Sequence, residues 1–167
     1  MTAAAHGGRA VVTLPTDTQI KITREFAAPK HLVYKAWTTP ELVKRWWNAK
    51  RGEVTVAEID LRVGGKWRWV MVTKKGFEVA FHGVYREVVP NERLVCTEIY
   101  EGAPPGVPNE GTLNTTTFSG ARDRTTLTLL VEAPSKEVRD MIIKSGMEAG
   151  LQDAFDLLEE VARELSS

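Results

Sequence analysis

Four of the five tryptophans in this chain lie between positions 46 and 69. They belong to a longer block, residues 45–100, in which runs of β-branched and aromatic residues alternate with turns containing Gly, Asn and Pro. Such alternation is typical of antiparallel strands. Tryptophan has a large apolar surface and usually forms a wall of a core or a pocket. The block therefore predicts a curved antiparallel sheet lined with aromatic side chains, but it says little about what that sheet holds.

Period-two patterns bounded by turn residues predict six to seven strands. In the segment 66–73, for example, Trp67, Trp69 and Met71 fall on the same face. The segment 112–119 is rich in threonine, which suits an edge strand or a partly wet sheet surface. The predicted strands are 19–26, 54–59, 66–73, 77–89, 93–100, 112–119 and 125–131.

Helical patterns occur in two places. Pro29 and Pro40 each stand where proline begins a helix, and apolar residues at helical spacing follow both of them. From Ser135 almost to the C-terminus, apolar residues recur every three or four positions, which predicts one helix of about thirty residues. Gly146 and Gly150 would share a face of this helix. They would either let it approach the sheet closely or leave room at the mouth of a cavity.

Together these elements predict an α+β fold. In this fold a curved antiparallel sheet of six to seven strands wraps around a long C-terminal helix, and two short helices follow the first strand. Only the C-terminal helix is long and apolar enough to cover the sheet. A twisted sheet curled around a straight helix leaves a gap unless large side chains fill it. We expect residues 1–15 to be a flexible N-terminal tail and residues 16–167 to form a single domain.

Charge and composition argue against several classes of function. Lys plus Arg and Asp plus Glu both number 22, so the net charge is zero and nothing indicates nucleic acid or an anionic membrane as a partner. No apolar stretch of 18 residues and no signal-like segment is present, so we expect no membrane insertion and a cytoplasmic location. The single cysteine, Cys96, favours a buried, inert thiol. We expect a monomer or a weak dimer.

The sequence predicts no catalytic residue, no metal site and no cofactor. Its three histidines lack the spacing and acidic companions of a zinc site. His82 could act as a general base inside a cavity, although its small and apolar neighbours on the strand favour a wall position. Glu58 and Asp60 share one face of a strand, which suits a solvated surface better than an acid–base pair.

Seven short motifs occur in a characteristic order and spacing: REFAAP at 24–29, WTTPEL at 37–42, RWW at 45–47, DLRVGG at 60–65, GVYREVVP at 83–90, RLV at 93–95 and SGMEAG at 145–150. Together they resemble the START-like helix-grip (SRPBCC, Bet v-like) superfamily over residues 19–165. Within it the chain is most similar to homologues of the activator of the heat shock protein 90 ATPase. The resemblance implies a helix-grip fold with an elongated cavity beneath the last helix. It implies no single activity, because members bind lipids, hormones, polyketides or proteins, or act on small molecules.

One pair of residues departs from the family pattern. Asn48 and Ala49 stand where the family often has a glycine followed by a proline, directly after the paired tryptophans. The departure concerns the mouth of the implied cavity and leaves the predicted fold unchanged.

Aromatic and methionine side chains on the predicted inner face form the candidate ligand-binding cavity. Rigid rings beside soft methionines suit a flat apolar ligand. The same side chains could simply fill the core, and the sequence leaves both interpretations open. The candidate cavity residues are Trp46, Trp47, Trp67, Trp69, Met71, Phe81, Tyr85, Met147, Leu151 and Phe155.

Three hypotheses of function follow. The first is non-catalytic binding of a hydrophobic small molecule, flat or aromatic, or a lipid or polyketide, between the sheet and the C-terminal helix. The second is a protein-interaction module that contacts a chaperone or another protein in a stress response, and it rests on the resemblance alone. The third is a cyclase- or hydrolase-like enzyme that uses His82 or a carboxylate in the same cavity.

Overall fold

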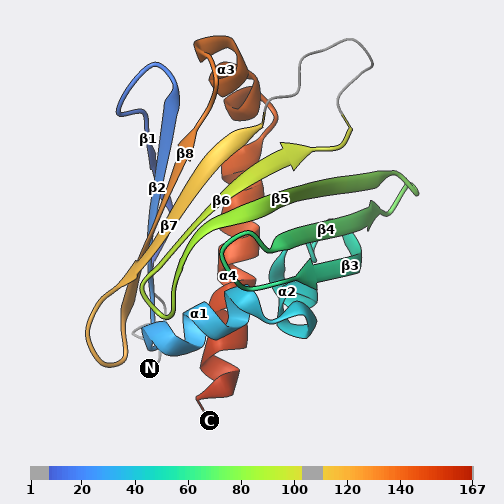
Figure 1. Cartoon of the computed structure of the whole chain (residues 1–167). Coiled ribbons are helices and arrows are strands. Elements are labelled where there is room, and N and C mark those ends of the chain that lie inside the picture. The colour runs from blue at the N-terminus through green and yellow to red at the C-terminus, as the bar shows by residue number, and fades with distance from the viewer. Residues whose placement is uncertain (1–7, 103–110, 167) are drawn as a thin grey trace.

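One curved antiparallel sheet forms the outer layer of the protein (Figure 1). The structure is a computed structural model that describes residues 8–102 and 111–166, and over these residues the sheet has eight strands. Their order is β1-β2-β8-β7-β6-β5-β4-β3, which leaves β1 and β3 at the edges. The strands are β1 Val11–Thr13, β2 Gln19–Phe26, β3 Gly52–Ile59, β4 Lys66–Thr73, β5 Glu78–Val89, β6 Arg93–Tyr100, β7 Thr112–Ser119 and β8 Thr125–Glu132.

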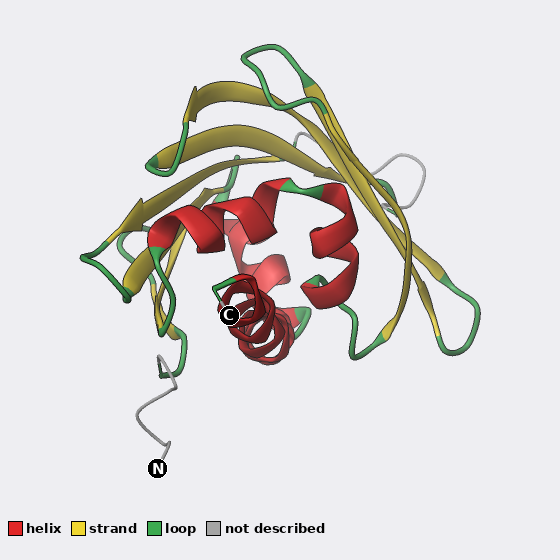
Figure 2. Cartoon of the chain, turned by 90° about the horizontal axis from the view of Figure 1, so that it is seen from below, coloured by secondary structure: helices red, strands yellow, loops and turns green. Residues whose placement is uncertain are grey.

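The helices lie inside the curve of the sheet. Figure 2, a view from below, shows the strands arching over them. The C-terminal helix packs mainly against the two short helices that follow β2, and it makes fewer close backbone approaches to the strands. This arrangement confirms the predicted α+β helix-grip fold. The helices are α1 Lys30–Thr38, α2 Pro40–Trp46, α3 Lys136–Lys144 and α4 Met147–Leu165.

The expected single C-terminal helix is two helices. Gly146 has a φ of +87°, a left-handed conformation that favours glycine, and it separates α3 from α4. The side chain of Ser135 caps α3 as predicted, because its hydroxyl accepts a hydrogen bond from the Val138 amide at 3.2 Å. Close packing on the sheet does not explain the glycines. A Cβ at Gly146 would meet no atom within 4 Å, and one at Gly150 would touch only the Arg51 side chain at 3.8 Å.

The threonine-rich strand β7 is an interior strand, and the expectation of an edge strand is wrong. It pairs with β6 on one side and β8 on the other. Its inward positions carry Asn114, Thr116 and Phe118, all of which are buried. The β-branched threonines fit a pleated surface equally well in the middle of a sheet.

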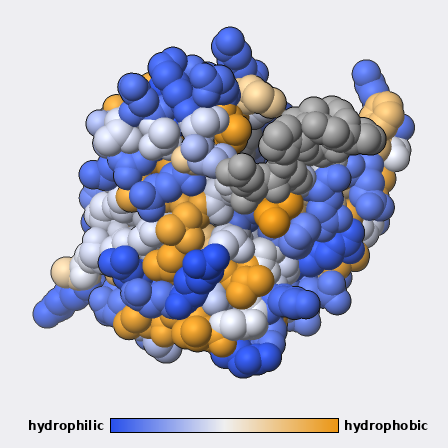
Figure 3. Space-filling model, turned by 45° about the horizontal axis from the view of Figure 1, so that its top comes forward, coloured by the Kyte–Doolittle hydropathy of each residue, from blue (hydrophilic) through white to orange (hydrophobic). Residues whose placement is uncertain are grey.

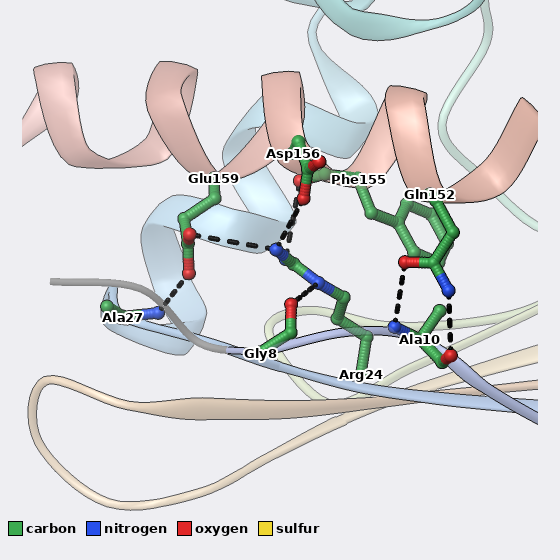
Figure 4. A network of polar contacts seen from close by, with 8 residues as sticks. All are labelled: Gly8, Ala10, Arg24, Ala27, Gln152, Phe155, Asp156 and Glu159. Atoms are coloured by element: carbon green, nitrogen blue, oxygen red, sulfur yellow. Dashed lines mark hydrogen bonds and ion pairs between the residues drawn. The ribbon is translucent and has the colours of Figure 1, made fainter. Parts of the chain in front are cut away.

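The expected N-terminal tail is partly structured. Residues 1–7 lie outside the described residues, but Val11–Thr13 pair with β2 and Ala10 is buried. The Gln152 side chain on α4 holds Ala10 from both sides, because its amide oxygen accepts from the Ala10 N–H at 3.0 Å and its amide nitrogen donates to the Ala10 carbonyl at 2.8 Å (Figure 4). The composition of the segment gave no sign of these backbone contacts.

A buried arginine ties the sheet to α4. Arg24 on β2 is almost completely buried, and its guanidinium donates to Asp156 Oδ1 at 2.9 Å and to the Gly8 carbonyl at 2.7 Å (Figure 4). It also lies 3.7 Å from Glu159 Oε1, and the other carboxylate oxygen of Glu159 accepts the Ala27 amide at 2.7 Å. Buried charges of this kind are stable only when they are paired and hydrogen-bonded. Arg24 therefore fixes the position of α4 relative to β2.

Candidate ligand-binding site on the concave face

The candidate cavity residues gather where the concave face meets α2 and α4. Nine of the ten belong to one contiguous apolar cluster. Met71 is the exception: it is buried, but it lies beside Gly52 at the edge of the sheet rather than in that cluster. Trp46, Trp67, Trp69, Tyr85 and Phe155 are buried, whereas Trp47, Phe81, Met147 and Leu151 are half-buried.

Edge-to-face ring contacts join α2 to the sheet. Trp69 is at their centre, with its ring centroid 5.9 Å from that of Trp46, 5.5 Å from Trp47 and 5.3 Å from Trp67. The Trp47 ring also contacts the Phe81 ring, with the two centroids 5.9 Å apart. Such pairs are favourable beyond the apolar area that they bury. The rings of Trp46 and Trp69 act as core, whereas the half-buried rings form an accessible rim.

Hydrogen bonds fix the orientation of two of these indoles. The Trp46 ring donates from Nε1 to the Ala36 carbonyl at 2.9 Å, which orients it between α1 and α2. The Trp67 ring donates to the Thr97 carbonyl at 3.1 Å and lies across Gly83, its partner on β5. A Cβ at Gly83 would lie 1.8 Å from the Thr97 carbonyl oxygen and 2.6 Å from Trp67 Nε1, so only glycine leaves room for this backbone and this ring.

The turn after the paired tryptophans explains the departure from the family pattern. Asn48 has a φ of +51°, a left-handed conformation that asparagine tolerates better than most residues with a side chain. Asn48 therefore takes the backbone conformation that a glycine would provide at this position.

The concave face also carries polar groups that sequence analysis missed. The Glu98 carboxylate on β6 accepts a hydrogen bond from Asn114 Nδ2 at 3.2 Å, and Thr112 Oγ1 donates to Asn114 Oδ1 at 2.8 Å. Burial raises the pKa of Glu98, and the Asn114 hydrogen bond opposes this shift. Two positions earlier on the same face, burial raises the pKa of Cys96 to about 12, so its thiol stays protonated at neutral pH. The clue was period two: Leu94, Cys96 and Glu98 alternate inward together.

Among residues 8–102 and 111–166, two buried donors on this side of the sheet have no hydrogen-bond partner. They are the Trp69 indole N–H and the Tyr34 hydroxyl, which are 8% and 7% exposed. Burial raises the pKa of Tyr34 and of Tyr85, so both phenols remain neutral. An unsatisfied buried donor is unfavourable, and each could be satisfied by an acceptor on a bound molecule.

His82, in contrast, lies on the convex face. Its Nδ1 is 2.9 Å from Glu101 Oε2, and Arg68 donates to both oxygens of the same carboxylate at 2.9 Å. This pairing, chiefly with Arg68, lowers the pKa of Glu101 to about 2. The hypothesis of His82 as a general base inside the cavity is therefore wrong, because the side chain points to the opposite side of the sheet.

Other polar candidates are also accounted for. Glu58 and Asp60 are exposed, as a solvated face requires, and Asp60 pairs with Arg62. Over residues 8–102 and 111–166, no three side chains of the kinds that ligate metals lie close enough to hold an ion. In the same part of the chain, no helix has the length and apolar character needed to cross a membrane.

Two open hollows lie away from the aromatic cluster. One, of about 570 Å³, lies beside the C-terminal half of α4, near Arg45 of α2 and Glu164. The other, of about 420 Å³, borders Gly52 and Val72 at the β3–β4 edge. Both are shallow surface features beside charged residues, so neither matches the expected apolar cavity.

Family comparison agrees with the fold. Residues 27–163, from directly after β2 to near the end of α4, match the family described as Activator of Hsp90 ATPase homolog 1-like protein. The chain belongs to this family. The match confirms the resemblance drawn from the sequence motifs. No curated protein matches the chain.

Solved structures share the overall shape of this Activator of Hsp90 ATPase homolog 1-like chain. A protein from Rhodobacter sphaeroides is 24% identical, with a TM-score of 0.84 over 94% of this chain and 99% of its own. One from Mycobacterium smegmatis is 22% identical, with a TM-score of 0.80 over 91% and 96%. One from Chromobacterium violaceum is 26% identical, with a TM-score of 0.75 over 88% and 98%. At this level of identity the likeness supports the fold and assigns no ligand.

Proposed function

We propose that this protein binds a hydrophobic small molecule with a flat or aromatic ring, without catalysing its conversion. The ligand enters between the concave face of the sheet and the first turns of α4. The observation that carries the proposal is the half-buried rim of Trp47, Phe81, Met147 and Leu151 around a rigid core of indoles. Apolar pockets with aromatic walls are the usual sites for such ligands.

The rim can make room for a ligand. Met147 and Leu151 occupy the first turns of α4, directly after the helix break at Gly146. Methionine adapts its shape readily, and half-buried side chains are less constrained than core ones. A flat molecule would lie against Trp47 and Phe81 and would displace the rim rather than the core.

Titration with 2-naphthalenemethanol, followed by tryptophan fluorescence and backbone amide shifts, tests the proposal. We expect saturable binding, with the largest shifts around Trp47, Phe81 and Met147. Trp47→Ala should weaken binding by at least about tenfold, because it removes one wall of the site.

Phe77→Ala serves as the matched control. Phe77 is an aromatic residue beside the β4–β5 turn, is 67% exposed and lies outside the cluster. Its removal should leave the affinity unchanged. Equal loss in both variants, or a wild-type protein whose rim signals do not move, would refute binding at this face.

The convex face offers less to an apolar partner. Figure 3 shows hydrophobic side chains there as separate patches among polar ones. A recognition site normally presents a contiguous apolar area. The concave rim therefore carries the functional proposal better than the face seen in this view.

A further inference from the structure

We propose that the ligand carries a protonated amine, which Glu98 binds at the far end of the aromatic face. The inference rests on the proposed function, since it assumes that a ring-bearing molecule occupies the concave side. It specifies the chemical class of that molecule as an aromatic or apolar amine.

The first step is the position of the carboxylate. Cys96 packs against the apolar cluster, and Asn114, its partner on β7, is 8% exposed. Glu98 reaches Asn114 from the same face. Its carboxylate is therefore on the concave side of the sheet and is not part of the solvated convex surface.

The second step is that Glu98 has few partners of its own. Within the described residues, the Asn114 amide is its only side-chain hydrogen-bond partner, and no lysine, arginine or histidine lies within ion-pair distance. One carboxylate oxygen is thus left for another donor. A buried carboxylate without a cation is unfavourable, which creates a strong preference for a ligand that supplies one.

The third step is accessibility. Glu98 is deep enough for burial to raise its pKa, yet the residue is only half-buried and keeps surface that a small molecule can reach. Cys96 shows the same combination. A small molecule held at the rim can therefore reach both side chains, which lie on β6 in the middle of the sheet.

The fourth step is the aromatic surface beside the carboxylate. The Trp67 indole is bonded to the Thr97 carbonyl, one residue before Glu98, and lies over Gly83 on the intervening strand. An ammonium group held by a carboxylate beside an indole gains both an ion pair and a cation–π contact. A neutral alcohol would gain neither.

The adjoining polar groups hold the acceptor in place. Thr112 fixes the amide of Asn114 with its oxygen toward the hydroxyl, so the amide nitrogen faces Glu98. The neutral, protonated thiol of Cys96 adds no competing charge. The unsatisfied Trp69 N–H, on the same face of β4 as Trp67, remains for an acceptor atom elsewhere on the ligand.

Two matched probes test the inference: 2-naphthylmethylamine and 2-naphthalenemethanol share the ring and differ in the amine. We expect the wild-type protein to bind the amine at least about tenfold more tightly at pH 7, measured by isothermal titration calorimetry. Glu98→Gln keeps the shape and the Asn114 partner but removes the charge. It should abolish this preference and leave the affinity for the alcohol within about twofold.

Glu58→Gln is the control, because Glu58 is an exposed carboxylate on the edge strand β3. It should retain the amine preference. If wild type binds both probes equally well, the amine inference is overturned while ring binding stands. If neither probe binds, the proposed function itself fails. The two-probe comparison on the wild-type chain decides the inference even if Glu98→Gln does not fold.

Discussion

Replacement of Arg24 by methionine should destabilise the protein far more than replacement of an exposed arginine that contacts the same helix. Arg24→Met keeps the apolar length of the side chain and removes a cation that is 1% exposed at its side chain. The Glu159 carboxylate beside it is only 4% exposed and cannot be rehydrated without opening the structure. Asp156 is 55% exposed, so water can hydrate its carboxylate once the arginine is removed.

The magnitude follows from these burials. Removal of one partner from a buried ion pair costs about 3–5 kcal/mol. The loss of the desolvated cation–π contact with the Phe26 ring, 4.6 Å from the guanidinium carbon, adds about 2 kcal/mol. Arg45→Met also removes a contact with α4, to Glu164, but both side chains are about half exposed, so its cost should stay below about 1 kcal/mol.

Urea unfolding at pH 7, followed by tryptophan fluorescence, measures both values. The double variant Arg24→Met with Glu159→Gln provides the decisive comparison, since it also removes the buried negative charge. We expect it to be more stable than Arg24→Met alone. Equal free energies of unfolding for Arg24→Met and Arg45→Met, or no recovery in the double variant, would refute the assignment of Arg24 as a buried anchor.

Three further predictions concern single groups. The Glu101 carboxyl should titrate with a midpoint near 2 in an NMR titration and return toward 4.5 in Arg68→Gln; the stability from this pairing is present above pH 4.5 and is lost as the pH falls toward 2. Cys96, with a pKa of about 12, should react with a thiol reagent at pH 8 at least about 100-fold more slowly in the native protein than in denaturant, and equal rates would contradict its burial. Ser135→Ala should lower the free energy of unfolding by about 1 kcal/mol through loss of the α3 cap, and a neutral result would show that the cap contributes nothing.

Much of the fold could be predicted because its signals are local. Strands such as Arg93–Tyr100 and Thr112–Ser119 begin and end at turn residues that are visible in the sequence. The placement of β7 inside the sheet was not predictable in this way, since strand order depends on contacts between distant segments. Gly146 was ambiguous for a different reason: a glycine within a helical pattern can mark close packing or a break, and only its φ of +87° decides.

The candidate site was predictable in part. Indoles at alternate positions, such as Trp67 and Trp69, identified the inner face of β4. His82 was not excluded from the cavity, although it alternates with Phe81 and therefore points the other way. Glu98 and Asn114 were overlooked because a lone polar residue in a strand resembles a solvated one. What distinguishes Glu98 from a solvated residue is its position in the inward-facing alternation of β6, next to the buried Asn114 of β7.

The short strand β1 also determines how this chain can be handled. By pairing with β2 through Val11–Thr13, it shields part of a long strand whose backbone would otherwise be open to another molecule. A chain trimmed to residue 16, which its N-terminal composition would invite, loses that shield. It also loses the Gly8 carbonyl that accepts from Arg24 and the hydrogen bonds between Ala10 and Gln152 on α4. Such a trimmed protein would present a new template for β-pairing and should self-associate, so affinity tags and cleavage sites belong before residue 8.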